Sequence, residues 1–155
     1  MQQRDLIILN GFTMKKLFFA ALLLIIIFSC KSSEVSFVNP ELFGTWVWIS
    51  TDGGIGNHIH NTPESTGFTI ELRLNKDSEY SLYKSKLRIG TGSYHITEKR
   101  SLLQNKLAAF ITLDENANDS SNIISSGMLI LEKKDTLIIS QDVYDGVGST
   151  FARLK

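Results

Sequence analysis

Two histidines, His58 and His60, stand two residues apart in a glycine-rich stretch, residues 52–63. If this stretch is extended, side chains at positions i and i+2 point to the same side, and the two imidazoles could bind one metal ion. A zinc site takes three or four protein ligands, and the sequence does not fix the position of the third histidine, His95, relative to the pair. We therefore predict no metal site and interpret the two histidines as polar residues of a loop.

A second candidate site is acidic. Residues 114–119 begin with the Asp-x-Asn-x-Asn spacing of a calcium loop. The sixth position of such a loop needs glycine and the twelfth needs a bidentate glutamate, but Asp119 and Ser125 stand there. We interpret this segment as a polar turn. The chain also contains no Gly-x-Ser-x-Gly, Gly-x-Gly-x-x-Gly or P-loop motif, so we expect neither an enzyme nor a cofactor.

Cys30 is the only cysteine, so no disulfide can form within the chain. Cys30 is preceded by a segment that begins with Lys15 and Lys16, continues through an unbroken apolar run at residues 17–28 and ends with Ser29. The apolar run is shorter than the about 20 residues that cross a bilayer. A basic start, a short apolar core and a small residue before a cleavage point are typical of an export signal.

The last three residues of this segment and the cysteine, Ile27-Phe28-Ser29-Cys30, resemble the lipobox of bacterial lipoproteins. The resemblance implies a signal peptide at residues 14–29 and attachment of diacylglycerol and palmitate to Cys30. It also implies a tether at residues 30–39 and anchoring in the cell envelope, with the outer membrane as the expected location. Residues 1–13 precede a better start and are interpreted as an over-extended beginning. The alternative is an uncleaved N-terminal helix with a free thiol.

The charge balance excludes one class of partner. The chain has 16 basic and 16 acidic residues, and a near-neutral protein has no electrostatic footprint for nucleic acid. The length after the tether, residues 40–155, fits one domain with a single core.

From Pro40 onward the hydrophobic period is two rather than 3.6, which predicts strands. In the strand predicted for residues 87–97, Leu87 and Ile89 share one face whereas Tyr94 and Ile96 belong to the other, and a bulge at residues 90–92 would place all four on the same face. Residues 99–107 could hold a helical turn. The predicted strands cover residues 45–49, 67–74, 80–83, 87–97, 107–113, 123–131, 136–140 and 149–154. About eight strands at regular spacing, most of them joined by polar turns, favour an all-β, eight-stranded antiparallel up-and-down barrel after an N-terminal signal helix.

Gly44-Thr45-Trp46 on the first strand resembles the Gly-x-Trp opening of lipocalins and related calycins. In that family the tryptophan packs across the closed end of the barrel and a basic residue near the last strand covers it. The resemblance implies this role for Arg153. Independently of the family, a guanidinium over an indole contributes roughly 0.5–2 kcal/mol. We expect Trp46 and Arg153 to form a clasp between the first and last strands.

The predicted function is that of a membrane-anchored envelope lipoprotein whose barrel binds a small, largely apolar ligand. We expect the longest segment without predicted structure, residues 51–66, to act as a lid made mobile by its glycines. The expected ligand-binding residues are Trp48, Phe68, Ile70, Leu72, Tyr80 and Leu82, and those of the lid are Gly53, Gly54, Gly56, His58 and His60. The alternative is a filled barrel that contacts another envelope protein, whose identity the sequence does not give.

Overall fold

The computed structural model describes residues 39–114, 123 and 126–155. The predicted signal peptide, Cys30 and nearly all of the tether lie outside the described residues, as does most of the acidic segment at residues 114–125. Within the part that the structure describes, no helix is long and apolar enough to cross a membrane.

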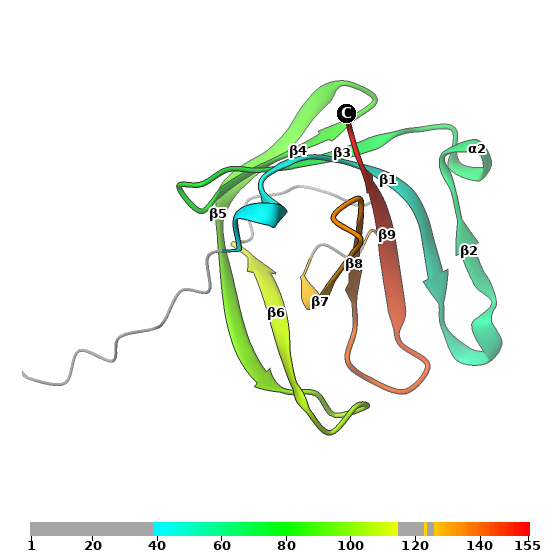
Figure 1. Cartoon of the computed structure of the whole chain (residues 1–155). Coiled ribbons are helices and arrows are strands. Elements are labelled where there is room, and N and C mark those ends of the chain that lie inside the picture. Colours follow the sequence, from blue (N-terminus) through cyan, green and yellow to red (C-terminus); the bar gives the residue numbers. More distant parts are fainter. Residues whose placement is uncertain (1–38, 115–122, 124–125) are drawn as a thin grey trace, which may run out of the picture. The chain divides into compact units, whose positions relative to one another are not determined.

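The described chain is an all-β, closed barrel of eight antiparallel strands in up-and-down order (Figure 1), which confirms the predicted fold class. Each of these eight strands pairs with its neighbour in the barrel, and the first strand closes the barrel by pairing with the last. A ninth, short strand adds to the edge of the first strand and pairs with no other strand. The strands are β1 (Gly44–Gly53), β2 (Ile59–Asn61), β3 (Ile70–Leu74), β4 (Glu79–Lys84), β5 (Leu87–Arg100), β6 (Leu107–Leu113), β7 (Gly127–Glu132), β8 (Thr136–Ser140) and β9 (Val147–Arg153).

Three short helical turns complete the described elements. η1 (Pro40–Leu42) precedes β1, η2 (Ile55–Asn57) joins β1 to β2, and α2 (Pro63–Thr66) joins β2 to β3. The last two correct the prediction of a structureless segment at residues 51–66. The reason is local chemistry that strand periodicity does not report, namely glycines at the reversal after β1 and a capping box at the start of α2.

The registers are staggered, as closure of a barrel requires. One edge of β1 is divided, because Gly44 to Val47 pair with β3 whereas Thr51 to Gly53 pair with β2. The long strand β5 pairs with β4 through its first half and with β6 through its second half. These changes of partner place β2 and the loop before it beside the end of β1.

The predicted bulge in β5 exists, but it lies at Ile89 rather than at residues 90–92. Leu82 of β4 pairs with Gly90 and the next residue, Tyr83, pairs with Arg88, which leaves Ile89 without a partner in the register. The helical turn expected as an option for residues 99–107 is reduced to a single turn, in which the amide of Asn105 donates to the carbonyl of Ser101 at 3.0 Å. β5 continues to Arg100, and no helix is present between it and β6.

The core lies inside the barrel and draws on every strand except β2. Trp46 and Trp48 are 0% and 1% exposed, and Phe151 of β9 packs in the same cluster. Gly92 lies against the ring of Tyr80, where an added Cβ would come within 3.1 Å of a ring carbon. The Tyr80 hydroxyl donates to the carbonyl of Asp114 at 2.7 Å, so a buried phenol keeps its hydrogen bond.

Candidate functional site

The expected clasp residues are in direct contact. Trp46 and Arg153 are partners in the β1–β9 register, and the Arg153 guanidinium carbon lies 4.1 Å from the centroid of the Trp46 ring. Arg153 also donates to the carbonyls of Phe43 at 2.8 Å, Lys134 at 2.7 Å and Glu41. One side chain therefore joins the last strand, the chain before β1 and the β7–β8 turn.

The six side chains expected to bind a ligand inside the barrel mostly form its core. Phe68 alone is half-buried, and it stacks on Trp48 with ring centroids 5.8 Å apart. The other five are each at most 3% exposed: Trp48, Ile70, Leu72, Tyr80 and Leu82. A surface so fully covered leaves no room for water beside these five described side chains. Polar side chains gather at the end of β1.

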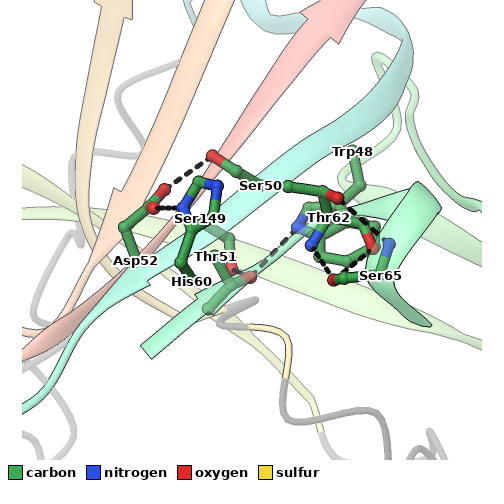
Figure 2. A network of polar contacts seen from close by, with 8 residues as sticks. All are labelled: Trp48, Ser50, Thr51, Asp52, His60, Thr62, Ser65 and Ser149. Carbon is green, nitrogen blue, oxygen red and sulfur yellow. Dashed lines mark hydrogen bonds and ion pairs between the residues drawn. The ribbon is translucent and has the colours of Figure 1, made fainter. Parts of the chain in front are cut away.

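A polar cluster stands at that end (Figure 2). The indole nitrogen of Trp48 donates to the Thr51 hydroxyl at 3.0 Å, and the Thr51 and Ser149 hydroxyls are 2.7 Å apart. Thr51 and Ser149 are 1% and 0% exposed. Thr51 reaches the interior because the β1–β9 register shifts between Trp48 and Ser50, which moves the inward face by one residue. We call Thr51 and Ser149 the polar floor, because their buried hydroxyl groups lie next to the apolar core.

Asp52 and His60 join β1 to β2. They are partners in the register, and the Nδ1 atom of His60 contacts the Asp52 carboxylate. The Ser50 hydroxyl donates to the other oxygen of that carboxylate at 2.6 Å. The hydrogen bond from Ser50, and next the one from His60, hold the pKa of Asp52 below its usual range against the smaller opposing effect of burial. Ser50 and Asp52 lie on the face of β1 opposite to the buried Thr51, because side chains alternate along a strand. Figure 2 shows their contacts with each other and with His60.

The glycines of the predicted lid build a turn. Gly53 has φ +131°, and a Cβ there would stand 2.2 Å from the carbonyl oxygen of Gly146. Gly54 has φ +79°, and its amide donates to the same carbonyl at 3.3 Å. Gly56 also has positive φ, at 67°, with open space around it. These residues therefore fix the reversal between β1 and β2.

Beyond β2, α2 begins with a reciprocal cap that holds the segment in place. The Ser65 amide donates to the Thr62 hydroxyl at 3.2 Å, and the Thr62 amide donates to the Ser65 hydroxyl at 2.9 Å (Figure 2). Such a capping box satisfies amides that the first turn of a helix leaves without partners.

A pocket of about 590 Å³ opens between the polar floor and β2. Its apolar wall consists of Ile59, Ile123 and Val147, and its polar wall of Thr51, His58, His60 and Asn61. The two predicted histidines of the lid therefore do share one pocket, whereas none of the six predicted interior residues lines it.

The histidine tautomers follow from their partners. The Nδ1 atom of His58 lies 2.8 Å from the carbonyl oxygen of Ile55, which only accepts, so Nδ1 carries the proton and donates. The carboxylate of Asp52 places the proton on Nδ1 of His60 in the same way. In its neutral form, each ring therefore keeps Nε2 as a hydrogen-bond acceptor.

Two histidines do not make a metal site. Within residues 39–114, 123 and 126–155, no three side chains of His, Cys, Asp or Glu come together closely enough to hold a metal ion. His95 lies elsewhere, with its Nε2 atom 3.6 Å from the carboxylate of Asp114.

Sequence patterns miss most residues of the site. They do not single out five of the seven that line the pocket, which are Thr51, Ile59, Asn61, Ile123 and Val147. The pairing of Asp52 with His60 is not indicated either, because a two-residue turn at Gly53-Gly54 would set Asp52 opposite Ile55, whereas the observed loop joins the paired residues Gly53 and Ile59. The inward position of Thr51 is not readable, because it depends on the register shift in β1.

A comparison of the chain with models of known protein families found no match, and searches among curated proteins and solved structures found none either.

Proposed function

We propose that this protein is a lipid-anchored lipoprotein of the bacterial cell envelope whose barrel binds a small amphipathic ligand at the end of β1. The ligand enters the pocket beside β2 and does not occupy the barrel interior. Cys30 carries the lipid, and the polar tether at residues 30–39 joins it to the barrel.

The pocket is the observation that carries the binding proposal. Its volume of about 590 Å³ falls within the roughly 300–1,000 Å³ of typical small-molecule sites. Such sites combine apolar walls with a few polar groups that orient the ligand. Here the side chains of Ile59, Ile123 and Val147 face a wall of hydroxyl, amide and imidazole groups.

The polar wall narrows the ligand chemistry. Thr51 and Asn61 can donate or accept, and the Nε2 atom of His58 accepts when that ring is neutral. His60 also lines the pocket, but its ring pairs with Asp52 on the face of the hairpin opposite to Thr51 and Asn61. A ligand with hydroxyl or amine donors at one end and a short apolar part at the other satisfies both walls. A long acyl chain does not fit, because the packed core below Thr51 closes the way into the barrel.

The binding test uses the fluorescent apolar probe N-phenylnaphthylamine and a variant that fills the pocket. We expect Val147→Trp to weaken probe binding at least about tenfold, since an indole would occupy space that a ligand needs. Val143→Trp is the matched control, because Val143 lies in the neighbouring connection, is 48% exposed and does not line the pocket. Equal affinities for the two variants would contradict the proposed site.

The anchor is tested separately by metabolic labelling with palmitate. Wild-type protein should take up the label and sediment with membranes, and Cys30→Ser should do neither. Retention of the label by Cys30→Ser would refute attachment at this cysteine without bearing on the pocket.

A second candidate function rests on the filled interior. A barrel whose interior residues are nearly all covered needs no ligand for stability and can act as a rigid module that contacts another envelope protein. This candidate predicts that wild-type protein binds no probe and that cross-linking in intact cells captures one defined partner.

A further inference from the structure

Five large apolar side chains stand exposed on three neighbouring connections of the barrel. Ile55 is 81% exposed, Leu102 76%, Leu103 40%, Val143 48% and Tyr144 87%. We call these five residues the apolar rim. Large exposed apolar side chains gathered at one place mark an interaction surface more often than scattered ones do.

Hydrogen bonds hold the three connections together. The carboxylate of Asp142, in the β8–β9 connection, accepts from the amides of Leu102 at 2.7 Å and Leu103 at 3.3 Å in the β5–β6 turn. It also accepts from the Ser101 hydroxyl at 2.7 Å. The amide of Gly54, next to Ile55, donates to Gly146 at 3.3 Å. Figure 1 shows the β5–β6 and β8–β9 connections together at the foot of the view.

The amides at the tip of the β5–β6 turn are hydrogen-bonded within the protein. All five amides of residues 101–105 have an acceptor within the protein: the carbonyls of Lys106 and Ser101, the hydroxyl of Ser101 and the carboxylate of Asp142. An exposed turn in water does not need this, because water satisfies its amides. A turn that enters an apolar phase does, since each unsatisfied amide there costs several kcal/mol.

The surroundings of the tip favour a bilayer as the occupant. The five residues of the rim lie in connections between strands and not on a face of the sheet, and their side chains are exposed. Arg100 and Lys106 flank the two leucines and are exposed, at the level where anionic headgroups would lie. Tyr144 is an aromatic residue of the kind enriched at membrane–water interfaces.

We propose that the apolar rim inserts into the surface of a phospholipid bilayer, with Leu102, Leu103 and Tyr144 below the headgroups and Arg100 and Lys106 among them. This inference does not depend on the proposed ligand or on the lipid at Cys30. It gives the barrel a fixed orientation on the membrane, with the pocket beside β2 near the lipid surface because Ile55 directly precedes that segment.

The test uses a chain that begins at Lys31, which lacks the signal and the cysteine. Its barrel can fold alone, because the described core comes entirely from residues 42–151. Vesicles of phosphatidylethanolamine and phosphatidylglycerol are floated with this chain and with the double variant Leu102→Ser/Leu103→Ser. Each leucine withdrawn from water changes a partition coefficient by roughly tenfold, so we expect the double variant to bind about a hundredfold more weakly.

Leu87→Ser is the matched control. Leu87 is 71% exposed, begins a strand after a turn and lies between Lys86 and Arg88, but it is not part of the rim. Its replacement should leave vesicle binding unchanged. Circular dichroism verifies that each variant is folded.

A second readout is independent of folding losses. Tyr144→Trp places a fluorophore on the rim, and its emission should shift to shorter wavelengths when vesicles are added, with quenching by brominated lipid. Absence of vesicle binding by the wild-type chain, or an unshifted emission of Tyr144→Trp on bound vesicles, would overturn the proposal. Self-association that Leu102→Ser/Leu103→Ser abolishes, without vesicle binding, would overturn it in favour of a protein partner.

Discussion

Removal of the Arg153 side chain should destabilise the barrel far more than removal of an exposed charge. Arg153 donates to three carbonyls, those of Glu41, Phe43 and Lys134, and lies over Trp46. These contacts tie both ends of the closed sheet to the β7–β8 turn.

Each hydrogen bond that involves a charged group contributes about 1.5–3 kcal/mol net when it is well shielded. Arg153 is half-buried, so water can replace part of each bond, and about 1 kcal/mol per bond is the appropriate figure. The ring contact at 4.1 Å adds about 1 kcal/mol. Arg153→Ala should therefore lower the free energy of unfolding by about 3–5 kcal/mol. Arg153→Lys should lose at least half of this, because an ammonium lacks the planar fork.

Urea unfolding followed by tryptophan fluorescence measures the change, since Trp46 and Trp48 are both buried and both report on the core. Arg73→Ala is the control. Arg73 also lies over an aromatic ring, 4.2 Å from the centroid of Tyr83, and pairs with Glu71, but its side chain is 50% exposed. This variant should lose at most about 1–2 kcal/mol, the sum of an exposed ring contact and an exposed ion pair. Equal losses for Arg153→Ala and Arg73→Ala would refute the argument.

Three further predictions concern stability. Gly92→Ala should cost about 1–2 kcal/mol in urea unfolding, because its methyl group would press on the Tyr80 ring; a stability equal to wild type would show that the ring moves freely. The hydrogen bond from Ser50 is the main cause that lowers the pKa of Asp52, so the stability that this carboxylate provides is present above its ordinary pKa and should be lost as the pH falls below about 4. Asp52→Asn should therefore make the free energy of unfolding less dependent on pH in this acid range. An unchanged pH dependence would contradict the role given to Asp52. Burial raises the pKa of Tyr94, so the free energy of unfolding should decrease as the pH rises above about 10, where the tyrosine ionises first in the unfolded chain. In Tyr94→Phe this alkaline decrease should be smaller. An identical decrease in the two proteins would contradict the role of Tyr94.

The fold was predictable because its main signal is short-range. Alternation such as that of Ile70, Leu72 and Leu74 marks a strand with one buried face, and polar turns between such strands predict antiparallel neighbours. Closure of the barrel was also predictable from two residue types, because Trp46 near the start of the domain and Arg153 near its end were expected to meet, and they are register partners.

The site was less predictable because it depends on register and on packing. The shift after Trp48 turns Thr51 inward, and no sequence period indicates it. Whether the six inward residues enclose a cavity or a packed core depends on barrel dimensions that the pattern does not contain. The histidines of the loop stood out in the sequence, but their common pocket exists only because β2 pairs with the end of β1.

Native mass spectrometry of the full-length protein, released gently from membranes, tests most directly whether a small ligand occupies the pocket at the end of β1. We predict a bound small molecule on the wild-type protein that is retained by Val143→Trp and absent from Val147→Trp. A wild-type barrel that carries no added mass, or an added mass that Val147→Trp keeps, would contradict it.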